Sequence, residues 1–343
     1  MTGTLTASFE RFGGPAVLDL VDRPAPVPVA DQVLVRVRAC GVNHLDLDIR
    51  RGRSRYDIPL PHTLGREIAG DVVELGDRVA HTRVGDRVLV RAHISCGRCD
   101  YCVRGEDNNC PAALLPGVNI GGGYTELVAV PERGLVPLPE VVSHVDAAAT
   151  QIAFGTAWHA LVRLARVPPG STVLVTGAAG GVGTAALQVA AGCGATVIAA
   201  AGSAARVARC LAAGADAGID YRAESLVDGV RRIGRPVDYV CETAGGEIFQ
   251  DALAALAVGG TMIVVGAHAG EVVPLDLVEL FRREIRVVGA RRATTADVRS
   301  VLRLVGEGVL TPTICEVRPL PEVREVHQRL ESRDGFGKWV LTP

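Results

Sequence analysis

The chain has 343 residues, of which 48% are hydrophobic and 22% charged, and its formal net charge is −2. The length favours two domains, each with its own buried core, and the composition excludes a disordered chain. The basic residues are scattered among acids and form no block, so we expect neither a nucleic-acid partner nor an anionic-membrane partner.

The N-terminal residues MTGTLTASFERFGG lack a basic region followed by an apolar core. No segment approaches the ~18 apolar residues that a membrane helix needs. Together these features predict a cytoplasmic location.

Residues up to about 130 alternate apolar and polar side chains in a β-like pattern, as in VLVRVRACGV and YTELVAV. Turns rich in Gly, Pro and Asp separate these stretches. The pattern predicts a small barrel-like β domain.

From about residue 147 onward, short apolar strands alternate with alanine-rich helical stretches. The expected strands are TVLVT, ATVIAA, VDYVCE, TMIVVG and IRVVG, and the expected helices are GTAALQVAAGCG, AARVARCLAAGA and FQDALAALAVGG. Such alternation is typical of βαβ units around a parallel sheet. The tail offers two helices and a strand, GKWVLTP, which we expect to return to the first domain. The predicted domains are therefore 1–148 and 149–294, with a return segment over 295–343.

A glycine-rich loop follows the expected strand at 172–176. Its sequence GAAGGVG carries Ala178, Gly180, Gly181, Val182 and Gly183, the AxGxxG variant of the dinucleotide fingerprint. Gly180 lets the backbone approach a pyrophosphate, Gly183 lets the helix pack on the strand, and the helix N-terminus supplies N–H donors. A strand before the loop and a helix after it favour dinucleotide binding over a tight structural turn.

The next expected strand ends at Gly202-Ser203, where an NAD-preferring site would place an acidic residue for the ribose 2′-OH. Ser203 and Arg206 stand there instead. A hydroxyl and a cation suit a 2′-phosphate, which favours NADPH. The alternative is that Arg206 is an ordinary exposed helix residue.

Four cysteines lie in one loop, CGRCDYCVRGEDNNC: Cys96, Cys99, Cys102 and Cys110. Four thiolates at this spacing can close a tetrahedral shell with no open position, which predicts a structural Zn²⁺. Two disulfides are the alternative, and without a secretion signal the expected compartment is reducing.

Taken together, these motifs resemble the medium-chain dehydrogenase/reductase superfamily, which includes zinc-type alcohol dehydrogenases and quinone oxidoreductases. The resemblance rests on GVNHLDLDIRRG, PHTLGREIAG, VGDRVLV, SCGRCDYC, GGYTELVAVP, FGTAWHAL, GAAGGVG and HQRLESRDGFGKWVL. It implies an α/β enzyme that uses NAD(P)H, with a GroES-like β-barrel catalytic domain, a doubly wound Rossmann sheet and an active site between them.

The resemblance also gives the positions where zinc alcohol dehydrogenases hold a catalytic metal. These fall on Asn43, Arg66 and Ile152, and the proton-relaying Ser or Thr falls on Leu45. Arginine is always protonated and has no lone pair for a metal. We therefore expect no catalytic zinc in this chain.

GVNHLD looks like the metal-free branch of quinone, enone and enoyl reductases, which implies NADPH-dependent reduction of an activated double bond. We expect Arg66, with the Asn43 amide, to stabilise the developing oxyanion while Glu67 and Asp46 hold Arg66 in place. The alternative is a closed salt bridge that only fills space. Other functions left open are an alcohol or carbonyl dehydrogenase, a redox-neutral biosynthetic enzyme and an idle cofactor-binding relative.

Four further residues are candidate cofactor contacts. The resemblance places His44 at the pyrophosphate and Thr156 at the nicotinamide end, while Tyr221 is expected against the adenosine and Lys338 at the 2′-phosphate. A packing role is the alternative for His44 and Thr156. The expected partners are a small-molecule substrate and further copies of the chain in a homodimer or homotetramer.

Overall fold

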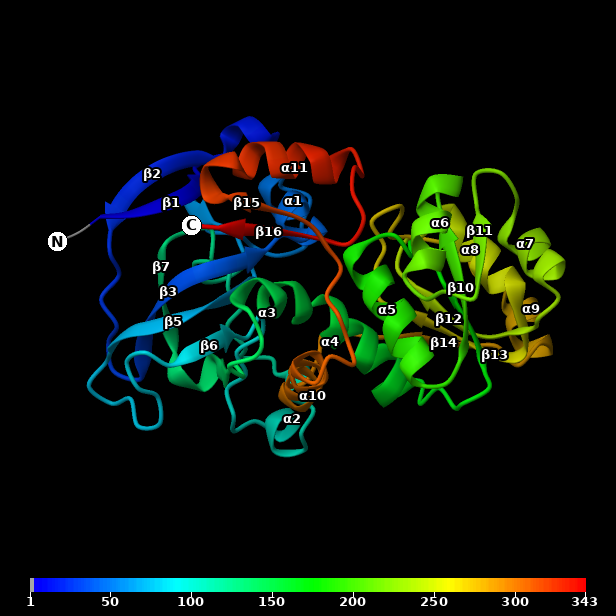
Figure 1. The fold of residues 1–343 in the computed structure, drawn as a ribbon, viewed down its shortest axis with the longest axis horizontal. Coiled ribbons are helices and arrows are strands. Elements are labelled where there is room, and N and C mark those ends of the chain that lie inside the picture. Colours follow the sequence, from blue (N-terminus) through cyan, green and yellow to red (C-terminus); the bar gives the residue numbers. More distant parts are fainter. Residues whose placement is uncertain (1–2) are drawn as a thin grey trace. The chain divides into compact units, whose positions relative to one another are not determined.

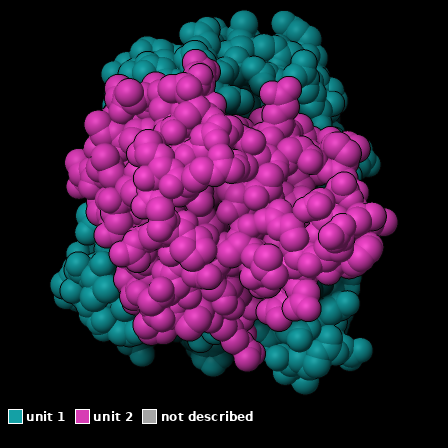
Figure 2. Space-filling model, turned by 90° about the vertical axis from the view of Figure 1, so that its right-hand side faces the viewer, with its two compact units in different colours: residues 1–152, 294–343 teal, residues 153–293 magenta. Residues whose placement is uncertain are grey.

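The computed structural model describes residues 3–343 and divides the chain into two compact units (Figures 1 and 2). Unit 1 contains residues up to 152 together with 294–343, and unit 2 contains residues 153–293. The boundary expected after residue 148 falls inside helix α3 (His144–Thr150), and Thr294 caps helix α10 (Thr295–Gly306), so both segments stay with unit 1.

Unit 1 is built on a seven-stranded sheet with the order β15-β16-β3-β5-β6-β8, in which β7 also pairs with β3. The strands are β3 (Gln32–Gly41), β5 (Glu67–Leu75), β6 (Arg87–Val90), β7 (Leu127–Pro131), β8 (Leu135–Pro137), β15 (Ile314–Pro319) and β16 (Lys338–Thr342). The return expected of the C-terminal strand is present, because β16 pairs antiparallel with β3 at Val340–Gly41 and Leu341–Cys40.

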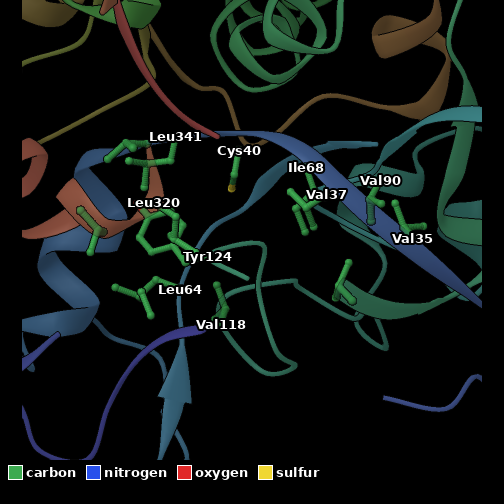
Figure 3. Close-up of a cluster of buried hydrophobic side chains, with 14 of the residues drawn as sticks. Val35, Val37, Cys40, Leu64, Ile68, Val90, Val118, Tyr124, Leu320 and Leu341 are labelled. Carbon is green, nitrogen blue, oxygen red and sulfur yellow. The ribbon is translucent and has the colours of Figure 1, made fainter. Parts of the chain in front are cut away.

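A second sheet of unit 1 has three strands in the order β2-β1-β4. They are β1 (Gly3–Phe9), β2 (Asp19–Pro24) and β4 (His62–Thr63), and the helices of this unit besides α3 and α10 are α1 (His44–Arg50), α2 (Asp100–Val103) and α11 (Val323–Glu331). Single 3₁₀ turns lie at Pro15–Val17, Asp107–Asn109, Glu132–Gly134 and Leu320–Glu322. Apolar side chains from both sheets and from the C-terminal segment form one core, part of which Figure 3 shows.

Unit 2 is a six-stranded parallel sheet with the order β11-β10-β9-β12-β13-β14. The strands are β9 (Thr172–Val175), β10 (Thr196–Ala201), β11 (Ala217–Asp220), β12 (Val237–Glu242), β13 (Leu256–Val264) and β14 (Arg286–Gly289). The order reverses direction between β9 and β12, as in a doubly wound Rossmann sheet.

Helices connect these strands, and Figure 1 shows them surrounding the sheet of unit 2. They are α4 (Ala153–Trp158), which continues as a π-helical turn over His159–Leu164, then α5 (Gly181–Gly192), α6 (Ala204–Ala212), α7 (Leu226–Ile233), α8 (Gly246–Ala255) and α9 (Leu277–Arg282). The inner strands β9 and β10 are buried along nearly their whole length, which explains their uninterrupted apolar sequences.

Candidate active site

A buried carboxylate and a buried ammonium group form the centre of the candidate site in unit 1. Glu67 begins β5 and Lys338 begins β16, and their side chains form an ion pair that is almost completely shielded from solvent. Lys338 Nζ also donates to the Val42 carbonyl and to Asn43 Oδ1, both at 2.9 Å. Glu67 Oε1 accepts from the backbone N–H of Ile152 at 2.6 Å.

The amide of Asn43 is fixed within the same cluster. Its Nδ2 donates to Glu67 Oε2 (3.0 Å) and to the Gly41 carbonyl (3.3 Å), while its Oδ1 accepts from Lys338. A carboxamide has two N–H hydrogens, so both are used within the protein. The expectation that the Asn43 amide donates to an oxyanion is therefore wrong for this arrangement, and Asn43 orients Glu67 and Lys338 instead.

Lys338 also differs from its expected role at a cofactor 2′-phosphate. Its three N–H donors go to three acceptors inside unit 1. Only 6% of the Lys338 side chain is exposed to solvent. We assign Lys338 to the Glu67 cluster because a buried ammonium needs its carboxylate partner.

Arg66, directly before Glu67, is buried but only sparsely bonded. Nη2 donates to the Ala92 carbonyl at 3.2 Å, whereas Nε has no partner within residues 3–343, where no carboxylate lies at ion-pairing distance from this guanidinium. Burial lowers the pKa of Arg66, and the charges of Asp46, Tyr56 and Glu67 act in the opposite direction. The closed salt bridge offered as the alternative for Arg66 is thus not the arrangement found.

Asp46 lies in the first turn of α1 and is completely buried. Its Oδ2 accepts from the backbone N–H of Asn43 (2.8 Å) and from the Tyr124 hydroxyl (3.3 Å), while Oδ1 has no partner in the described chain. Burial raises the pKa of Asp46 to about 6, although these hydrogen bonds and the charges of Arg66 and Lys338 favour the ionised form.

These donor atoms do not fit a catalytic zinc ion. Zinc binds thiolate, imidazole or carboxylate ligands. At the family's ligand positions stand Arg66, which has no lone pair, Asn43, whose carbonyl accepts from Lys338, and Ile152, which is aliphatic.

The four lobe cysteines, in contrast, fit a metal well. The sulfur atoms of Cys96, Cys99, Cys102 and Cys110 all lie within 4.8 Å of one another. Backbone N–H groups of Arg98 and Cys99 lower the pKa of Cys96 to about 6, while burial and the neighbouring thiols raise that of Cys102 to about 11. A divalent cation bound there would hold all four as thiolates, and this donor set with no open position is that of a structural Zn²⁺.

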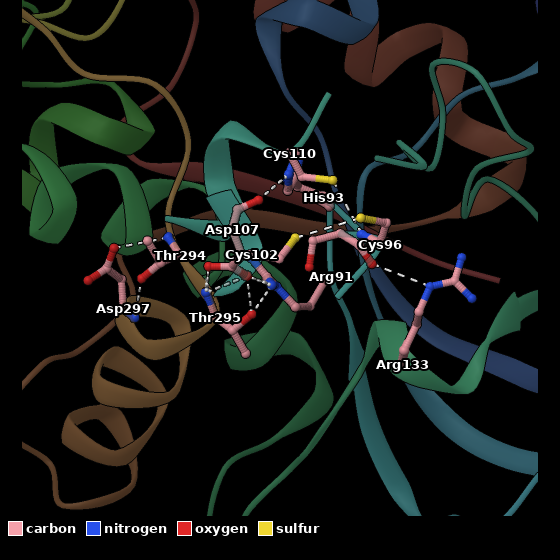
Figure 4. A network of polar contacts seen from close by, with 12 residues as sticks. Arg91, His93, Cys96, Cys102, Asp107, Cys110, Arg133, Thr294, Thr295 and Asp297 are labelled. Atoms are coloured by element: carbon pink, nitrogen blue, oxygen red, sulfur yellow. Dashed lines mark hydrogen bonds and ion pairs between the residues drawn. The ribbon is translucent and has the colours of Figure 1, made fainter. Parts of the chain in front are cut away.

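An ionic network connects this lobe to α10 within unit 1 (Figure 4). Asp107 pairs with Arg91 (2.6 Å), accepts from the backbone N–H of Thr295 (3.1 Å) and bonds with its hydroxyl, and the Asp107 carbonyl contacts His93 Nε2 at 2.7 Å. Burial would raise the pKa of Asp107, but the Thr295 hydroxyl and the Arg91 charge hold it below its usual value. The lobe is therefore tied to the C-terminal segment by the hydrogen bonds of Thr295.

The glycine loop of unit 2 fits a dinucleotide pyrophosphate. Gly180 caps α5 without a side-chain hydrogen bond, so the first N–H groups of this 12-residue helix face no capping side chain. A Cβ at Gly183 would collide with the backbone of Gly177 and Ala178, whereas a Cβ at Gly180 would only come into van der Waals contact with the Gly177 carbonyl oxygen, at 3.4 Å. Gly181 and Val182 supply the first two residues of the helix.

The remaining cofactor candidates lie on several elements. Ser203 caps α6, its hydroxyl accepting from the backbone N–H of Arg206 at 3.3 Å, and the Tyr221 ring lies against Gly202 at the end of β10. Thr156 is in α4, and His44 is the first residue of α1 in unit 1. The structure thus brings Ser203, Arg206 and Tyr221 together in unit 2.

Two sets of buried polar residues near the candidate sites were not predicted from the sequence. Glu242 ends β12 beside β9 and is fully buried, accepting from Thr176 Oγ1 (3.1 Å) and from the N–H groups of Ala244 and Gly245 (2.8 and 2.9 Å). The sequence signal for Glu242 is its place as the acidic residue that ends the otherwise mainly apolar strand VDYVCE, next to the strand that leads into the glycine loop. The second set is Tyr124, whose hydroxyl contacts Asp46, and His327, which contacts Tyr124; neither has a local sequence signal.

Comparison with known proteins decides the family. Residues 29–140 match the alcohol dehydrogenase GroES-like domain, and residues 181–307 match the zinc-binding dehydrogenase domain. An NAD-dependent alcohol dehydrogenase of Sulfurisphaera tokodaii is 32% identical over 95% of this chain and 96% of its own. The chain belongs to the medium-chain dehydrogenase/reductase superfamily.

Two further relatives show the range of this superfamily. An acryloyl-coenzyme A reductase of Metallosphaera sedula is 30% identical over 92% of this chain and 94% of its own. A solved structure described as an NAD-dependent alcohol dehydrogenase is 37% identical, covers 99% of each chain and superposes with a TM-score of 0.93. This medium-chain protein is accordingly an NAD(P)H-dependent oxidoreductase with a GroES-like domain, a Rossmann domain and a small-molecule substrate. Within residues 3–343, no helix is both long and apolar enough to cross a membrane.

Proposed function

We propose that this medium-chain oxidoreductase reduces an activated carbon–carbon double bond or a quinone with NADPH, and that Arg66 stabilises the oxyanion that forms. The observation that carries the proposal is the buried guanidinium of Arg66, which has one hydrogen bond to Ala92 and no carboxylate partner in the described chain. A buried cation without a counter-charge is costly, so a transient anion as its partner is the most favourable use of it.

The reaction needs charge stabilisation at one oxygen atom. Bound NADPH would supply hydride to the β-carbon of an enone, enoyl thioester or quinone, and the π electrons would move onto the carbonyl oxygen. Arg66 would donate hydrogen bonds to that oxygen in a site shielded from water. A proton from solvent would then neutralise the enolate at its α-carbon, or at oxygen for a quinone.

Glu67, Lys338 and Asn43 satisfy one another's charges and hydrogen bonds and leave Arg66 out of their ion pair. Because Glu67 is neutralised by Lys338 and receives hydrogen bonds from Asn43 and Ile152, it does not form an ion pair with the adjacent Arg66. Asp46 contributes negative charge at longer range, since its carboxylate favours the charged form of Arg66. The cluster thereby leaves the N–H donors of Arg66 available, and the Asp46 charge stabilises the buried guanidinium.

The residues of unit 2 that follow strand β10 are the reason for proposing NADPH instead of NADH. Ser203 caps α6 and Arg206 lies in its first turn, directly after β10, where an acidic residue would favour the 2′-OH of NAD. The cysteine lobe would hold a structural Zn²⁺, and the oligomer would be a homodimer or homotetramer. The second candidate function, oxidation of an alcohol with NAD⁺ or the reverse reduction of a carbonyl with NADH, is favoured by the names of several relatives.

A substrate screen tests the proposal. NADPH and NADH oxidation would be followed with quinones, enals, enones and enoyl thioesters, and NAD(P)⁺ reduction with plain alcohols. We expect turnover with NADPH and a conjugated acceptor, and a loss of about 10²–10³-fold in kcat for Arg66→Met, as for removal of an oxyanion donor.

Arg36→Met is the matched control, because Arg36 is exposed on β3. It should retain the wild-type kcat. An Arg66→Met protein that folds, binds NADPH and keeps a near-normal kcat would leave Arg66 a packing role only, and ready oxidation of alcohols with no conjugated acceptor used would favour the second candidate.

A further inference from the structure

Behind Asp46, a row of buried polar side chains crosses the core of unit 1. Arg50 Nη1 lies 3.0 Å from His327 Nδ1, His327 Nε2 lies 3.2 Å from the Tyr124 hydroxyl, and that hydroxyl lies 3.3 Å from Asp46 Oδ2. The Tyr124 ring itself sits in the hydrophobic cluster of Figure 3, and all four residues are essentially inaccessible to solvent.

The direction of every hydrogen bond in this row follows from the chemistry of arginine. A guanidinium only donates, so His327 Nδ1 must accept, and the ring is the neutral tautomer with its proton on Nε2. Nε2–H then donates to the Tyr124 oxygen, which leaves the tyrosine hydrogen for Asp46. Burial and the charges of Arg50 and Arg51 lower the pKa of His327 to about 3, in agreement with a neutral ring.

Arg50, at the end of the row away from Asp46, is held in place by further contacts of its guanidinium. Arg50 donates through Nε to the Gly13 carbonyl at 3.1 Å and forms an ion pair with Glu331. Glu331 also pairs with Arg51 at 3.0 Å. Arg50 is thus fixed as a donor to His327 by two acceptors from different segments.

We infer that Tyr124 is a positioning residue, held by His327 and Arg50 as a one-way hydrogen-bond donor that keeps the Asp46 carboxylate ionised and oriented. This inference rests on the proposed function in one respect, namely that the negative charge of Asp46 stabilises the buried Arg66 guanidinium that would meet the oxyanion. The hydrogen-bond direction itself does not depend on the reaction.

Asp46 is surrounded by charged and titratable groups from several elements. Arg66 and Lys338 favour its ionised form, as do the hydrogen bonds from the Asn43 backbone and Tyr124, and burial opposes them. Cys40 of β3 and Glu67 of β5 belong to the same cluster, since the charges of Asp46 and Glu67 both raise the pKa of Cys40. Removing the Tyr124 hydroxyl removes one of the groups that favour the carboxylate, so the pKa of Asp46 must rise.

The first experiment reads the direction of the row without any substrate. Histidine labelled with ¹⁵N gives separate signals for the two ring nitrogens, and the chain has eight histidines. His327→Gln identifies the signals of His327. We expect a ring protonated at Nε2 and unprotonated at Nδ1, unchanged over about pH 5 to 8. The opposite tautomer, or titration in this range, would overturn the inference.

The second experiment titrates Asp46 by infrared difference spectroscopy with ¹³C-labelled aspartate, assigned with Asp46→Asn. We expect the midpoint of Asp46, about 6 in the wild type, to rise by up to about one unit in Tyr124→Phe. Tyr101→Phe, in which an exposed ring is altered, should leave it in place.

Two substitutions at His327 distinguish the effect of its hydrogen bonds from the effect of its packing. Gln offers both an acceptor for Arg50 and a donor for Tyr124, so His327→Gln should retain the wild-type midpoint, whereas His327→Leu should raise it as Tyr124→Phe does. An unchanged midpoint in a folded Tyr124→Phe or His327→Leu protein contradicts the inference.

The two proposals fail in different ways. If no conjugated acceptor is reduced while the Asp46 midpoint shifts as described, the proposed function fails and the positioning role stands. If acceptors are reduced, the acid limb of the kcat/KM profile should move to higher pH in Tyr124→Phe, and a limb that stays in place counts against the role.

Discussion

Arg66 and Lys338 are both buried cations of unit 1, but their N–H groups are used differently. Lys338 directs its three donors to a carboxylate, an amide oxygen and a carbonyl, so no donor remains for a ligand. Within residues 3–343, Arg66 gives one hydrogen bond, to the Ala92 carbonyl. This difference assigns a structural role to Lys338 and leaves Arg66 as the group able to meet a developing negative charge.

The Glu67–Lys338 pair should therefore be important for stability. Lys338→Met leaves Glu67 buried without a counter-charge, and we expect the free energy of unfolding to fall by about 3–5 kcal/mol. In the double variant Glu67→Gln/Lys338→Met the uncompensated charge is gone, so most of this loss should be recovered. Urea denaturation measures both.

An exposed ion pair provides the control for this experiment. Arg231 and Asp228 on α7 lie 2.9 Å apart with most of both side chains in solvent, and Arg231→Met should change stability little. If Lys338→Met were as harmless as Arg231→Met, the pair could not be the centre of the cluster described above.

At the scale of elements, the hydrophobic patterns located five of the six strands of the Rossmann sheet but misplaced one boundary. The alanine-rich stretch 249–260 was expected to be a single helix, yet α8 ends at Ala255 and β13 begins at Leu256. Leu256 pairs with Val237 of β12, and Thr261 to Val264 continue the ladder. Pairing with a neighbouring strand overrides local helix propensity there. None of the expected strands covers β1, β2, β4, β8, β11 or β15.

The exposed surface of strand β14 and helix α9 leads to a prediction about the oligomeric state of the protein. Within residues 3–343, β14 is an edge strand that pairs with β13 on one side, and Val287 on it is 40% exposed. On α9, Leu277 and Phe281 expose 64% and 67% of their surface. An unpaired edge beside apolar side chains favours association with a second copy.

Phe281→Asp should therefore shift the protein toward the monomer in sedimentation velocity. Val84→Asp, at a valine of similar exposure (61%) in a turn of unit 1, should leave the oligomer intact. A wild-type chain that sediments as a monomer would contradict the proposed homodimer or homotetramer.

At the scale of the whole molecule, the sequence predicted what is encoded locally. The glycine loop, the four cysteines and the strand–helix alternation are each read within one segment, and the structure places all three as expected. The partners of the candidate site could not be read in this way. Lys338 meets Glu67 across 271 residues and His327 meets Tyr124 across 203, and no local pattern encodes such pairs.

The same limit explains the two corrected roles. Lys338 was expected at a cofactor 2′-phosphate, and Asn43 was expected at an oxyanion together with Arg66. Folding β16 beside β3 brings Lys338 to Asn43 and Glu67, and their hydrogen bonds are then satisfied by one another. Satisfaction of buried polar groups depends on the tertiary structure, so it decides such roles only once the fold is known.

The central claim is that the candidate site works through Arg66 and that the cysteine lobe holds the chain's metal. Counting zinc by elemental analysis, on enzyme that is actively reducing a conjugated acceptor, tests this claim most directly. We predict about one zinc per chain, lost in a Cys102→Ser variant. About two zinc ions per chain, with one retained in Cys102→Ser and required for turnover, would contradict the account.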